Sequence, residues 1–371
     1  MMYILRDWRS TLPQPTFEGS NTMRPKQASF LLLLTCVLGL ALLSARSLAH
    51  AVPASASGYH VVKTIAIGGE GQWDYSIVDS DARRVYISHA THVVVLDADS
   101  DAVVGDIPDT QGVHGIALAP DLGRGFTSNG KTNTVTIFDL KTLKTIATVA
   151  AGGENPDAIF YDAASQRALV FNGKTNNVTA INAADGSVVG TIPLEGKPEF
   201  AAGAGDGRVF ANLADKSQIV QIDAQKFTII NRWSLAPCKE PSGLAMDKKN
   251  RRLFAVCDNT MMAVVNADTG KVVATPAIDE DPDAAGFDPG TQLAFSSNGG
   301  AGNLTVIHED TPDTYSVVEN VPTKKYARTM AIDFKTHNIF LPIAIFEGVK
   351  APGQRRPPMR PDSFGVLLLT K

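Results

Sequence analysis

The chain has 371 residues, with 34 Lys and Arg against 38 Asp and Glu, and a formal net charge of −4. An acidic balance repels phosphate backbones, so no nucleic-acid partner is expected. With 44% apolar residues, 7% aromatic residues and 31 glycines, the composition indicates a large core built from small and branched side chains.

Residues 1–51 predict an N-terminal extension followed by a secretory signal peptide of bacterial type. Arg24 and Lys26 precede an apolar run over residues 30–43, and residues 47–51 (Ser-Leu-Ala-His-Ala) have small side chains at the two positions that a signal peptidase reads. We expect cleavage after Ala51, a short linker over residues 52–58, and a periplasmic or secreted protein.

Two alternatives concern this segment. The apolar run, of about 14 residues, is short for a membrane span, so an uncleaved anchor is the lesser alternative and no stable membrane anchor is expected. Residues 1–22 precede an ordinary signal architecture, and Met23 is an alternative start. Removal of residues 1–51 takes away Cys36 and leaves 29 basic against 36 acidic residues.

From Asp74 onward the chain repeats a unit of 40 to 45 residues. The residue that opens each unit and the residue five positions later recur in one register, with steps of 40, 43, 42, 43, 41 and 45 between openings. The opening residues are Asp74, His114, Asp157, Glu199, Ser242, Asp283 and Arg328. A second marker ends the third apolar run of the units, at Asp97, Asp139, Asn182, Asp223 and Asn266, with His308 in the sixth unit.

Each unit predicts four short strands. Stretches such as residues 134–138 (Thr-Val-Thr-Ile-Phe) are β-branched and aromatic, and Pro-Asp, Asn-Gly and Asp-Gly pairs between such stretches are typical of tight turns. Four strands per repeat indicate one propeller blade. The fold class is therefore all-β, a seven-bladed β-propeller with four-stranded blades over residues 59–371.

The two ends of the repeat region predict how the ring closes. Residues 366–370 (Val-Leu-Leu-Leu-Thr) form the third strand of the last unit, and the chain ends where a fourth strand would begin. Residues 59–68 (Tyr-His-Val-Val-Lys-Thr-Ile-Ala-Ile-Gly) match the fourth strand of the second unit, residues 143–149. We expect the N-terminal strand to complete the last blade and remove the open edges.

The repeats resemble those of the YVTN family of β-propellers, the YncE-like proteins. The family phrases survive as residues 115–121 (Gly-Ile-Ala-Leu-Ala-Pro-Asp), 133–139 (Asn-Thr-Val-Thr-Ile-Phe-Asp) and 188–192 (Val-Val-Gly-Thr-Ile). The resemblance covers nearly all of residues 59–371 and implies an exported seven-bladed propeller. It departs from the family at Leu213 and Ile343, where an Asn follows the second strand in other units.

The seven opening residues form the candidate functional site. First strands line the channel of a propeller, so these side chains are expected in a ring near one mouth, with His89, Asn129, Asn172 and Asn298 near the same face. Carboxylates with an imidazole can bind a divalent cation such as Ca²⁺, Mn²⁺ or Zn²⁺; the candidate ligands are Asp74, His114, Asp157, Glu199 and Asp283. The alternative is structural: polar groups keep the channel wet, and Arg328 pairs with Asp283 or Asp74.

Two functions remain open. The favoured one is a monomeric binding or scaffold protein that holds a protein, peptide or small ligand at the channel mouth. The alternative is a lactonase-like or other metal-dependent enzyme at the same place, an analogy of fold alone. No Gly-x-Ser-x-Gly elbow, His-Glu-x-x-His motif or phosphate loop is present, so neither hydrolase nor nucleotide chemistry has a motif in the sequence.

Three further segments complete the expectations. Cys238 and Cys257 fall on one face of the fifth blade and predict a disulfide, with two separate buried thiols as the alternative. A Pro- and Arg-rich insertion at residues 350–361 predicts a solvated loop; the alternatives are a grip on an anionic partner or a cover over the channel mouth. Residues 97–101 (Asp-Ala-Asp-Ser-Asp) imitate a calcium loop but predict a hairpin turn.

Overall fold

The computed structural model describes residues 57–69, 71–354 and 356–371. Every described residue belongs to the compact unit that spans residues 54–371. The predicted signal peptide and most of the linker lie outside the described residues. Among the residues that are described, no helix has the length and apolar character needed to cross a membrane.

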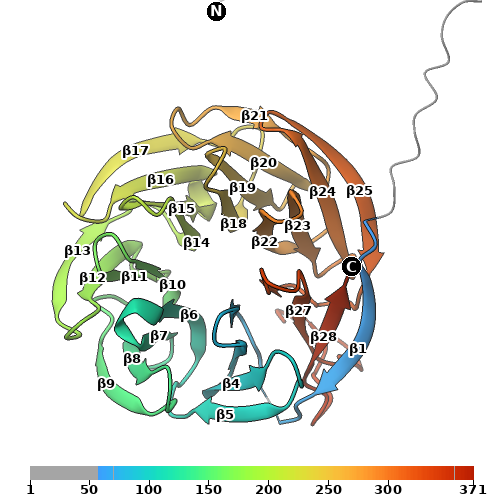
Figure 1. Cartoon of the computed structure of the whole chain (residues 1–371), viewed down its shortest axis with the longest axis horizontal. Coiled ribbons are helices and arrows are strands. Elements are labelled where there is room, and N and C mark those ends of the chain that lie inside the picture. Colours follow the sequence, from blue (N-terminus) through green and yellow to red (C-terminus); the bar gives the residue numbers. More distant parts are fainter. Residues whose placement is uncertain (1–56, 70, 355) are drawn as a thin grey trace, which may run out of the picture. The chain divides into compact units, whose positions relative to one another are not determined.

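Within the described residues, seven antiparallel four-stranded sheets follow one another around a ring (Figure 1). Each is a blade, numbered here in chain order. Blade 1 consists of β2 (Ser76–Asp79), β3 (Arg84–His89), β4 (His92–Asp97) and β5 (Val103–Ile107). Blade 2 consists of β6 (Val113–Ala119), β7 (Arg124–Asn129), β8 (Thr134–Asp139) and β9 (Thr145–Ala150), with the 3₁₀ turn η1 (Pro120–Leu122) after β6.

Blades 3 to 5 continue this order. Blade 3 has β10 (Pro156–Asp162), β11 (Arg167–Asn172), β12 (Asn177–Asn182) and β13 (Val188–Pro193). Blade 4 has β14 (Pro198–Gly203), β15 (Arg208–Leu213), η2 (Ala214–Lys216), β16 (Gln218–Asp223) and β17 (Thr228–Ser234). Blade 5 has β18 (Pro241–Asp247), β19 (Arg252–Cys257), β20 (Met261–Asn266) and β21 (Val272–Ala274).

The last two blades differ in how they are completed. Blade 6 has β22 (Pro282–Asp288), β23 (Leu293–Asn298), β24 (Asn303–Thr311) and β25 (Thr314–Pro322). Blade 7 has β26 (Ala331–Ile332), β27 (Ile339–Ile343) and β28 (Gly365–Thr370), and its outer strand is β1 (His60–Ala66). β1 pairs antiparallel with β28 from His60 opposite Thr370 to Ala66 opposite Gly365, so the predicted closure is confirmed.

Two sets of repeated residues supply turn caps: the Asp residues five positions after an opening residue, and the Asp residues that end third strands. Asp79, Asp162 and Asp247 accept hydrogen bonds from backbone N–H groups two or three residues later, in the turns between first and second strands. Asp97 and Asp139 do the same between third and fourth strands. Short carboxylate and amide side chains are selected there because they replace backbone partners in a tight turn. Residues 97–101 therefore form a hairpin turn.

The core lies between neighbouring blades. An aromatic residue in the middle of the second strand recurs in six blades and is at most 1% exposed: Tyr86, Phe126, Phe210, Phe254, Phe295 and Phe340. Burial of one such side chain stabilises the fold by about 1.5–3 kcal/mol. These aromatic side chains pack between neighbouring blades and hold the blades together. The first strands of the blades therefore begin at fixed positions around the central channel.

Candidate functional site

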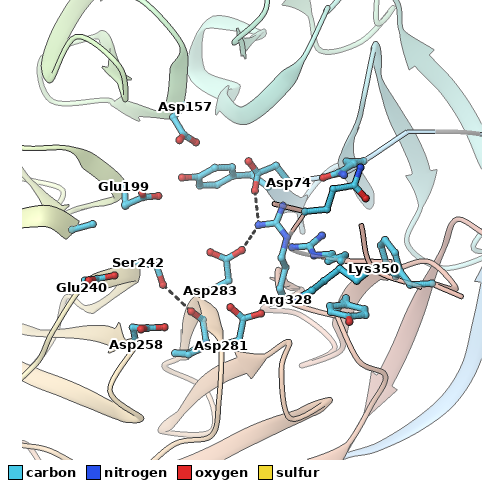
Figure 2. Close-up of a pocket in the computed structure, with 18 of the residues that line it drawn as sticks. Asp74, Asp157, Glu199, Glu240, Ser242, Asp258, Asp281, Asp283, Arg328 and Lys350 are labelled. Carbon is cyan, nitrogen blue, oxygen red and sulfur yellow. Dashed lines mark hydrogen bonds and ion pairs between the residues drawn. The ribbon is translucent and has the colours of Figure 1, made fainter. Parts of the chain in front are cut away.

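One mouth of the ring encloses a cavity of about 1590 Å³ (Figure 2). Six of the seven predicted opening residues line it: Asp74, Asp157, Glu199, Ser242, Asp283 and Arg328. The seventh, His114, is bonded to Asp74. Asp74 and Arg328 come just before β2 and β26, whereas the other opening residues lie within their first strands.

Two aromatic rings form the floor of this cavity. Tyr75 of blade 1 and Phe200 of blade 4 both line it, and their ring centroids are 4.2 Å apart. Tyr75 packs against the core cluster between blades 3 and 4, so its side chain reaches across the channel. The contact between Tyr75 and Phe200 therefore crosses the channel from blade 1 to blade 4, and the cavity that these two rings border is called the cup here.

The insertion in blade 7 forms part of the wall. Lys350, Gln354, Arg356 and Met359 are among its residues that line the cavity. The Arg356 guanidinium lies 5.6 Å from the ring centroid of Tyr326 and 5.8 Å from that of Phe346, a geometry in which cation–π attraction holds the side chain in place. The insertion thus lines one side of the mouth, while most of its described residues are exposed, as expected for a solvated loop.

Arg328 organises one side of the cup. Its guanidinium forms ion pairs with Asp283 and, at 3.2 Å, with Asp74, and it donates a hydrogen bond to the backbone oxygen of Trp73 at 2.8 Å. The Asp74 carboxylate is also 2.6 Å from Nδ1 of His114. The sequence predicted that Arg328 pairs with Asp283 or with Asp74, and in the structure it pairs with both.

These contacts shift pKa values in opposite directions. Burial acts to raise the pKa of Asp74, but Arg328 and the hydrogen bond with His114 outweigh it and lower that pKa. Burial acts to lower the pKa of His114, but the hydrogen bond and the charge of Asp74 raise it. For Asp283, burial outweighs Arg328 and raises the pKa.

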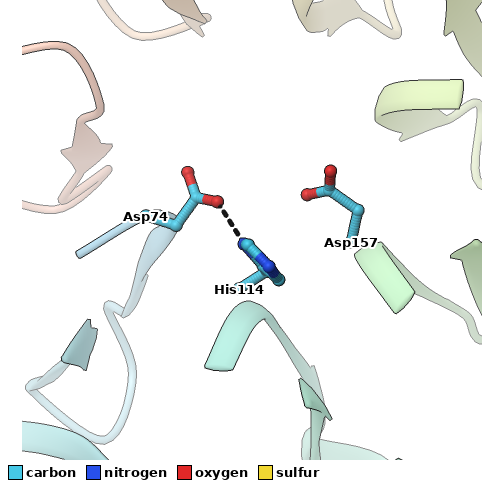
Figure 3. Close-up of side chains that lie close together, drawn as sticks. All are labelled: Asp74, His114 and Asp157. Atoms are coloured by element: carbon cyan, nitrogen blue, oxygen red, sulfur yellow. Dashed lines mark hydrogen bonds and ion pairs between the residues drawn. The ribbon is translucent and has the colours of Figure 1, made fainter. Parts of the chain in front are cut away.

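Asp157 faces this network from blade 3 (Figure 3). One ligand atom from each of Asp74, His114 and Asp157 lies within 4.8 Å of the others. Burial, followed by the charge of Asp74, raises the pKa of Asp157 to about 7. Burial also raises the pKa of Glu199, against the opposing ion pair with Lys197. Asp157 is the opening carboxylate without an ion pair to a described residue.

Gly130 is required for this arrangement. A Cβ atom on Gly130 would lie 2.7 Å from two ring atoms of His114, closer than side-chain carbons approach. The Asn-Gly pair of the turn between β7 and β8 thus leaves the room in which the imidazole reaches Asp74. A second Asn-Gly pair consists of Asn172, the last residue of β11, and Gly173. A Cβ atom on Gly173 would lie 3.6 Å from Oδ2 of Asp157.

Asp157→Asn is expected to remove a pH dependence of stability. Asp157 titrates at about 7 when folded, against an ordinary value of 3.8. A raised carboxyl pKa favours folding below the unfolded value, and this contribution is lost as pH rises through the folded value. Between pH 5 and pH 8 the wild type should therefore lose on the order of 1 kcal/mol or more relative to the variant. Denaturant unfolding at both pH values measures this, and parallel pH profiles would contradict it.

The remaining predicted residues have different places. Ser242 lines the cavity, but its hydroxyl donates to the backbone oxygen of Pro282 at 3.0 Å. The amides at the ends of the second strands are fully buried and bond inside their own blades, as when Asn129 donates to Thr134 and Thr136. Asn172 and Asn298 make the equivalent bonds. Contrary to expectation, these three amides do not line the cup, because the next strand of the blade offers them hydrogen-bond partners.

His89 is also separate from the cup. Its imidazole is 1% exposed and stacks on Phe364, with ring centroids 4.0 Å apart. It lines a second, smaller cavity of about 570 Å³, together with His92. Burial, followed by the charge of His92, lowers the pKa of His89 to about 4, so the ring is neutral at physiological pH.

Cys238 and Cys257 form a disulfide in the structure. Cys238 precedes β18, and Cys257 ends β19. Pro241 of β18 is the register partner of Cys257, so the bond fixes the connection that enters blade 5 next to Glu240 and Pro241 of the cavity wall.

The lining residues Tyr75, Phe200, Glu240 and Asp258 have no counterpart in the sequence predictions. A signal for the floor exists. The position after the opening residue holds Tyr75 and Phe200 in two units, but a small or short side chain in the other five: Gly115, Ala158, Gly243, Ala284 and Thr329. Two aromatic residues in an otherwise small column could have been recognised as a plug.

Comparisons with known proteins support the fold. The family model described as "Domain of unknown function (DUF5074)" matches residues 126–242, from β7 to the start of β18 and less than half of the chain. No curated protein matches. Neither comparison bears on the YVTN resemblance.

Solved structures match over most of the chain. One from Kuenenia stuttgartiensis hydrazine synthase is 17% identical, covers 76% of this chain and 94% of its own, and has a TM-score of 0.63. U3-55K is 9% identical, with coverages of 83% and 98% and a TM-score of 0.69. A chain of the mitotic checkpoint complex is 12% identical, with coverages of 84% and 92% and a TM-score of 0.69. At these identities the likeness concerns the β-propeller fold alone.

Proposed function

We propose that this protein is an exported, YncE-like binding protein that holds a protein, peptide or small ligand in the cup at the channel mouth. The observation that carries the proposal is the cavity of about 1590 Å³, which has an aromatic floor. It exceeds the roughly 300–1,000 Å³ of ordinary small-molecule sites. Its walls include six of the opening residues, whose side chains differ in charge from one unit to the next.

The lining and the compartment both support this proposal. Eight acidic and four basic residues line the cup, so it offers charged groups for recognition rather than an apolar surface. The signal-like N-terminus and the disulfide between Cys238 and Cys257 both favour an oxidising compartment outside the cytoplasm. A closed ring of seven blades is a rigid support for such a site.

The double variant Asp157→Asn, Glu199→Gln is expected to weaken ligand binding at least ten-fold. It removes two carboxylates from the cup and keeps Asp283, which Arg328 needs as a partner. The control variant Asp81→Asn, Asp185→Asn removes the same charge from exposed turns on strand ends away from the cup.

The measurement uses mature protein and an extract of small molecules and peptides from the periplasm. Retained molecules are identified by mass spectrometry, and their affinities for the three proteins are measured by calorimetry. Thermal unfolding checks that all three proteins are folded. If the double variant retains every molecule as tightly as the wild type does, the cup is not the binding site.

A second candidate function is metal-assisted hydrolysis, such as lactone hydrolysis, or oxidation. Its specific support is the grouping of Asp74, His114 and Asp157 within 4.8 Å. The fit is partial, because Asp74 already uses one oxygen for His114 and the other for Arg328. Nε2 of His114 and the Asp157 carboxylate remain for Ca²⁺, Mn²⁺ or Zn²⁺. This candidate predicts near-stoichiometric metal in purified mature protein and lactone hydrolysis that a chelator abolishes; elemental analysis without metal would reject it.

A further inference from the structure

Charge is divided across the cup. The acidic side comes from blades 3 to 5 and includes Asp157, Glu199, Glu240 and Asp258. The basic side comes from blade 7 and includes Arg328, Lys350 and Arg356. Figure 2 shows Asp157, Glu199, Glu240 and Asp258 on one side of the cavity, and Arg328 with Lys350 on the other. Because blades 3 to 5 and blade 7 stand on different sides of the ring, the two charged walls face each other (Figure 1).

On the basic wall, Lys350 and Arg356 are the cations without an ion pair to a described residue, and Arg356 is the more buried of the two. Arg328 is already engaged by Asp74, Asp283 and the backbone oxygen of Trp73. Arg356 makes no ion pair with any described residue, and its buried Nη1 atom has no hydrogen-bond partner among them. A buried guanidinium nitrogen without a partner is costly, whereas a carboxylate can accept two of its N–H groups at once.

On the acidic wall, Asp157 is the corresponding anion. Glu199 is paired with Lys197, and no described side chain donates a hydrogen bond to the Asp157 carboxylate. The hydroxyl of Tyr75, on the floor, is buried and has no partner among the described residues. An ammonium group brings three donors, and the faces of Tyr75 and Phe200 add cation–π attraction. Asp157 and the floor together therefore suit an amine.

From these two open groups we infer that the cup binds a dipolar organic ligand of the oligopeptide type, with its ammonium group at Asp157 and its carboxylate at Arg356. The inference rests on the proposed binding function and specifies the ligand. In a free amino acid a single carbon atom joins the ammonium group to the carboxylate, whereas in a peptide a longer chain separates the two charges. A volume of about 1590 Å³ accommodates a peptide of several residues.

A simple ion fits the same groups less well. An isolated divalent cation at Asp157 would leave Arg356 unpaired and would lie beside the positive charge of Arg328. An isolated anion at Arg356 would leave Asp157 unpaired and would face the acidic wall. A ligand with both charges, held apart by a chain, satisfies both groups at once.

The test uses a tryptic digest of serum albumin as the probe, with immobilised mature protein. Each peptide in the digest has a free amino terminus and a free carboxyl terminus. Parallel samples of the digest are acetylated on amines or methyl-esterified on carboxyls, and retained peptides are quantified by mass spectrometry. For the wild type, we expect either treatment to lower retention at least ten-fold.

Two variants assign the ends of the ligand. Arg356→Gln should lower retention of the untreated digest and abolish its sensitivity to esterification, while sensitivity to acetylation remains. Asp157→Asn should have the opposite pattern. Arg360→Gln, on the same insertion but outside the cavity lining, and Asp81→Asn are matched controls that should behave like the wild type. Thermal unfolding verifies the fold of each variant.

The outcomes separate this inference from the proposed function. The inference of a dipolar ligand is wrong if esterified peptides are retained to the same extent as untreated peptides, or if no peptide is retained. Binding of other molecules that still depends on Asp157 and Glu199 would then leave the proposed function intact. If the variant Asp157→Asn, Glu199→Gln changes the binding of no molecule, both fail.

Discussion

Replacing Arg328 with methionine is expected to lower the free energy of unfolding by about 3–5 kcal/mol. The guanidinium is 16% exposed, and it pairs with the carboxylates of Asp74 and Asp283, which are 17% and 24% exposed. Methionine fills similar space but removes the guanidinium charge from two largely buried carboxylates, so that Asp74 keeps His114 as a partner while Asp283 keeps no ion pair to a described residue. The loss comes from the removed charge rather than from a cavity.

A comparison of variants separates charge from packing. Arg328→Lys keeps the charge but cannot reach Asp74, Asp283 and the Trp73 backbone oxygen together, so an intermediate loss is expected. Adding Asp283→Asn to Arg328→Met should recover part of the stability, because the carboxylate without an ion pair is then replaced by a neutral amide. Denaturant unfolding at pH 7 measures all four proteins. A change below about 1 kcal/mol in Arg328→Met would place the pair among weak surface ion pairs.

Removal of the disulfide with Cys238→Ala and Cys257→Ala is expected to lower the unfolding free energy by about 3 kcal/mol. The two cysteines are 19 positions apart, so the bond restricts a loop of moderate length in the unfolded chain. Both residues are almost fully buried, at 2% and 0% exposure, and alanine is tolerated there without exposing a polar group.

Reduction provides the matched measurement. Dithiothreitol should lower the unfolding free energy of the wild type by a similar amount and leave that of the double-alanine variant unchanged. A wild type produced with residues 1–51 removed, in a reducing cytoplasm, should resemble the double-alanine variant until it is oxidised. Equal stabilities of oxidised and reduced wild type would show that the bond contributes nothing to folding.

Periodicity accounts for how much of the fold is predictable. The alternation within strands, the turn-capping Asp and Asn residues, and the match between residues 59–68 and 143–149 are local or repeated signals. Each can be read along the chain without knowledge of distant contacts. They were sufficient for seven four-stranded blades, the closure of blade 7 by β1, and the convergence of the opening residues at one mouth.

The repeat predicted the position of a residue more reliably than the hydrogen-bond partner of its side chain. Asn129, Asn172 and Asn298 follow the same register as the opening residues, yet their amides bond to hydroxyl and amide groups on the first residue of the next strand, five positions along the chain. Register places a residue on a strand end but does not decide between a local partner and the cavity. That choice depends on the hydrogen-bond groups that the following strand presents.

The contents of the cup were decided by contacts between blades that are far apart in sequence. Tyr75 meets Phe200 across the channel, Arg328 of blade 7 joins Asp74 of blade 1, and the insertion brings Arg356 over Phe346 and Tyr326. No repeat predicts these contacts, because each occurs once and depends on the direction of a side chain or the path of a loop. The repeated pattern along the chain specified the ring and its seven first strands, whereas tertiary packing specified the floor and the charged walls that make the ring mouth a binding site.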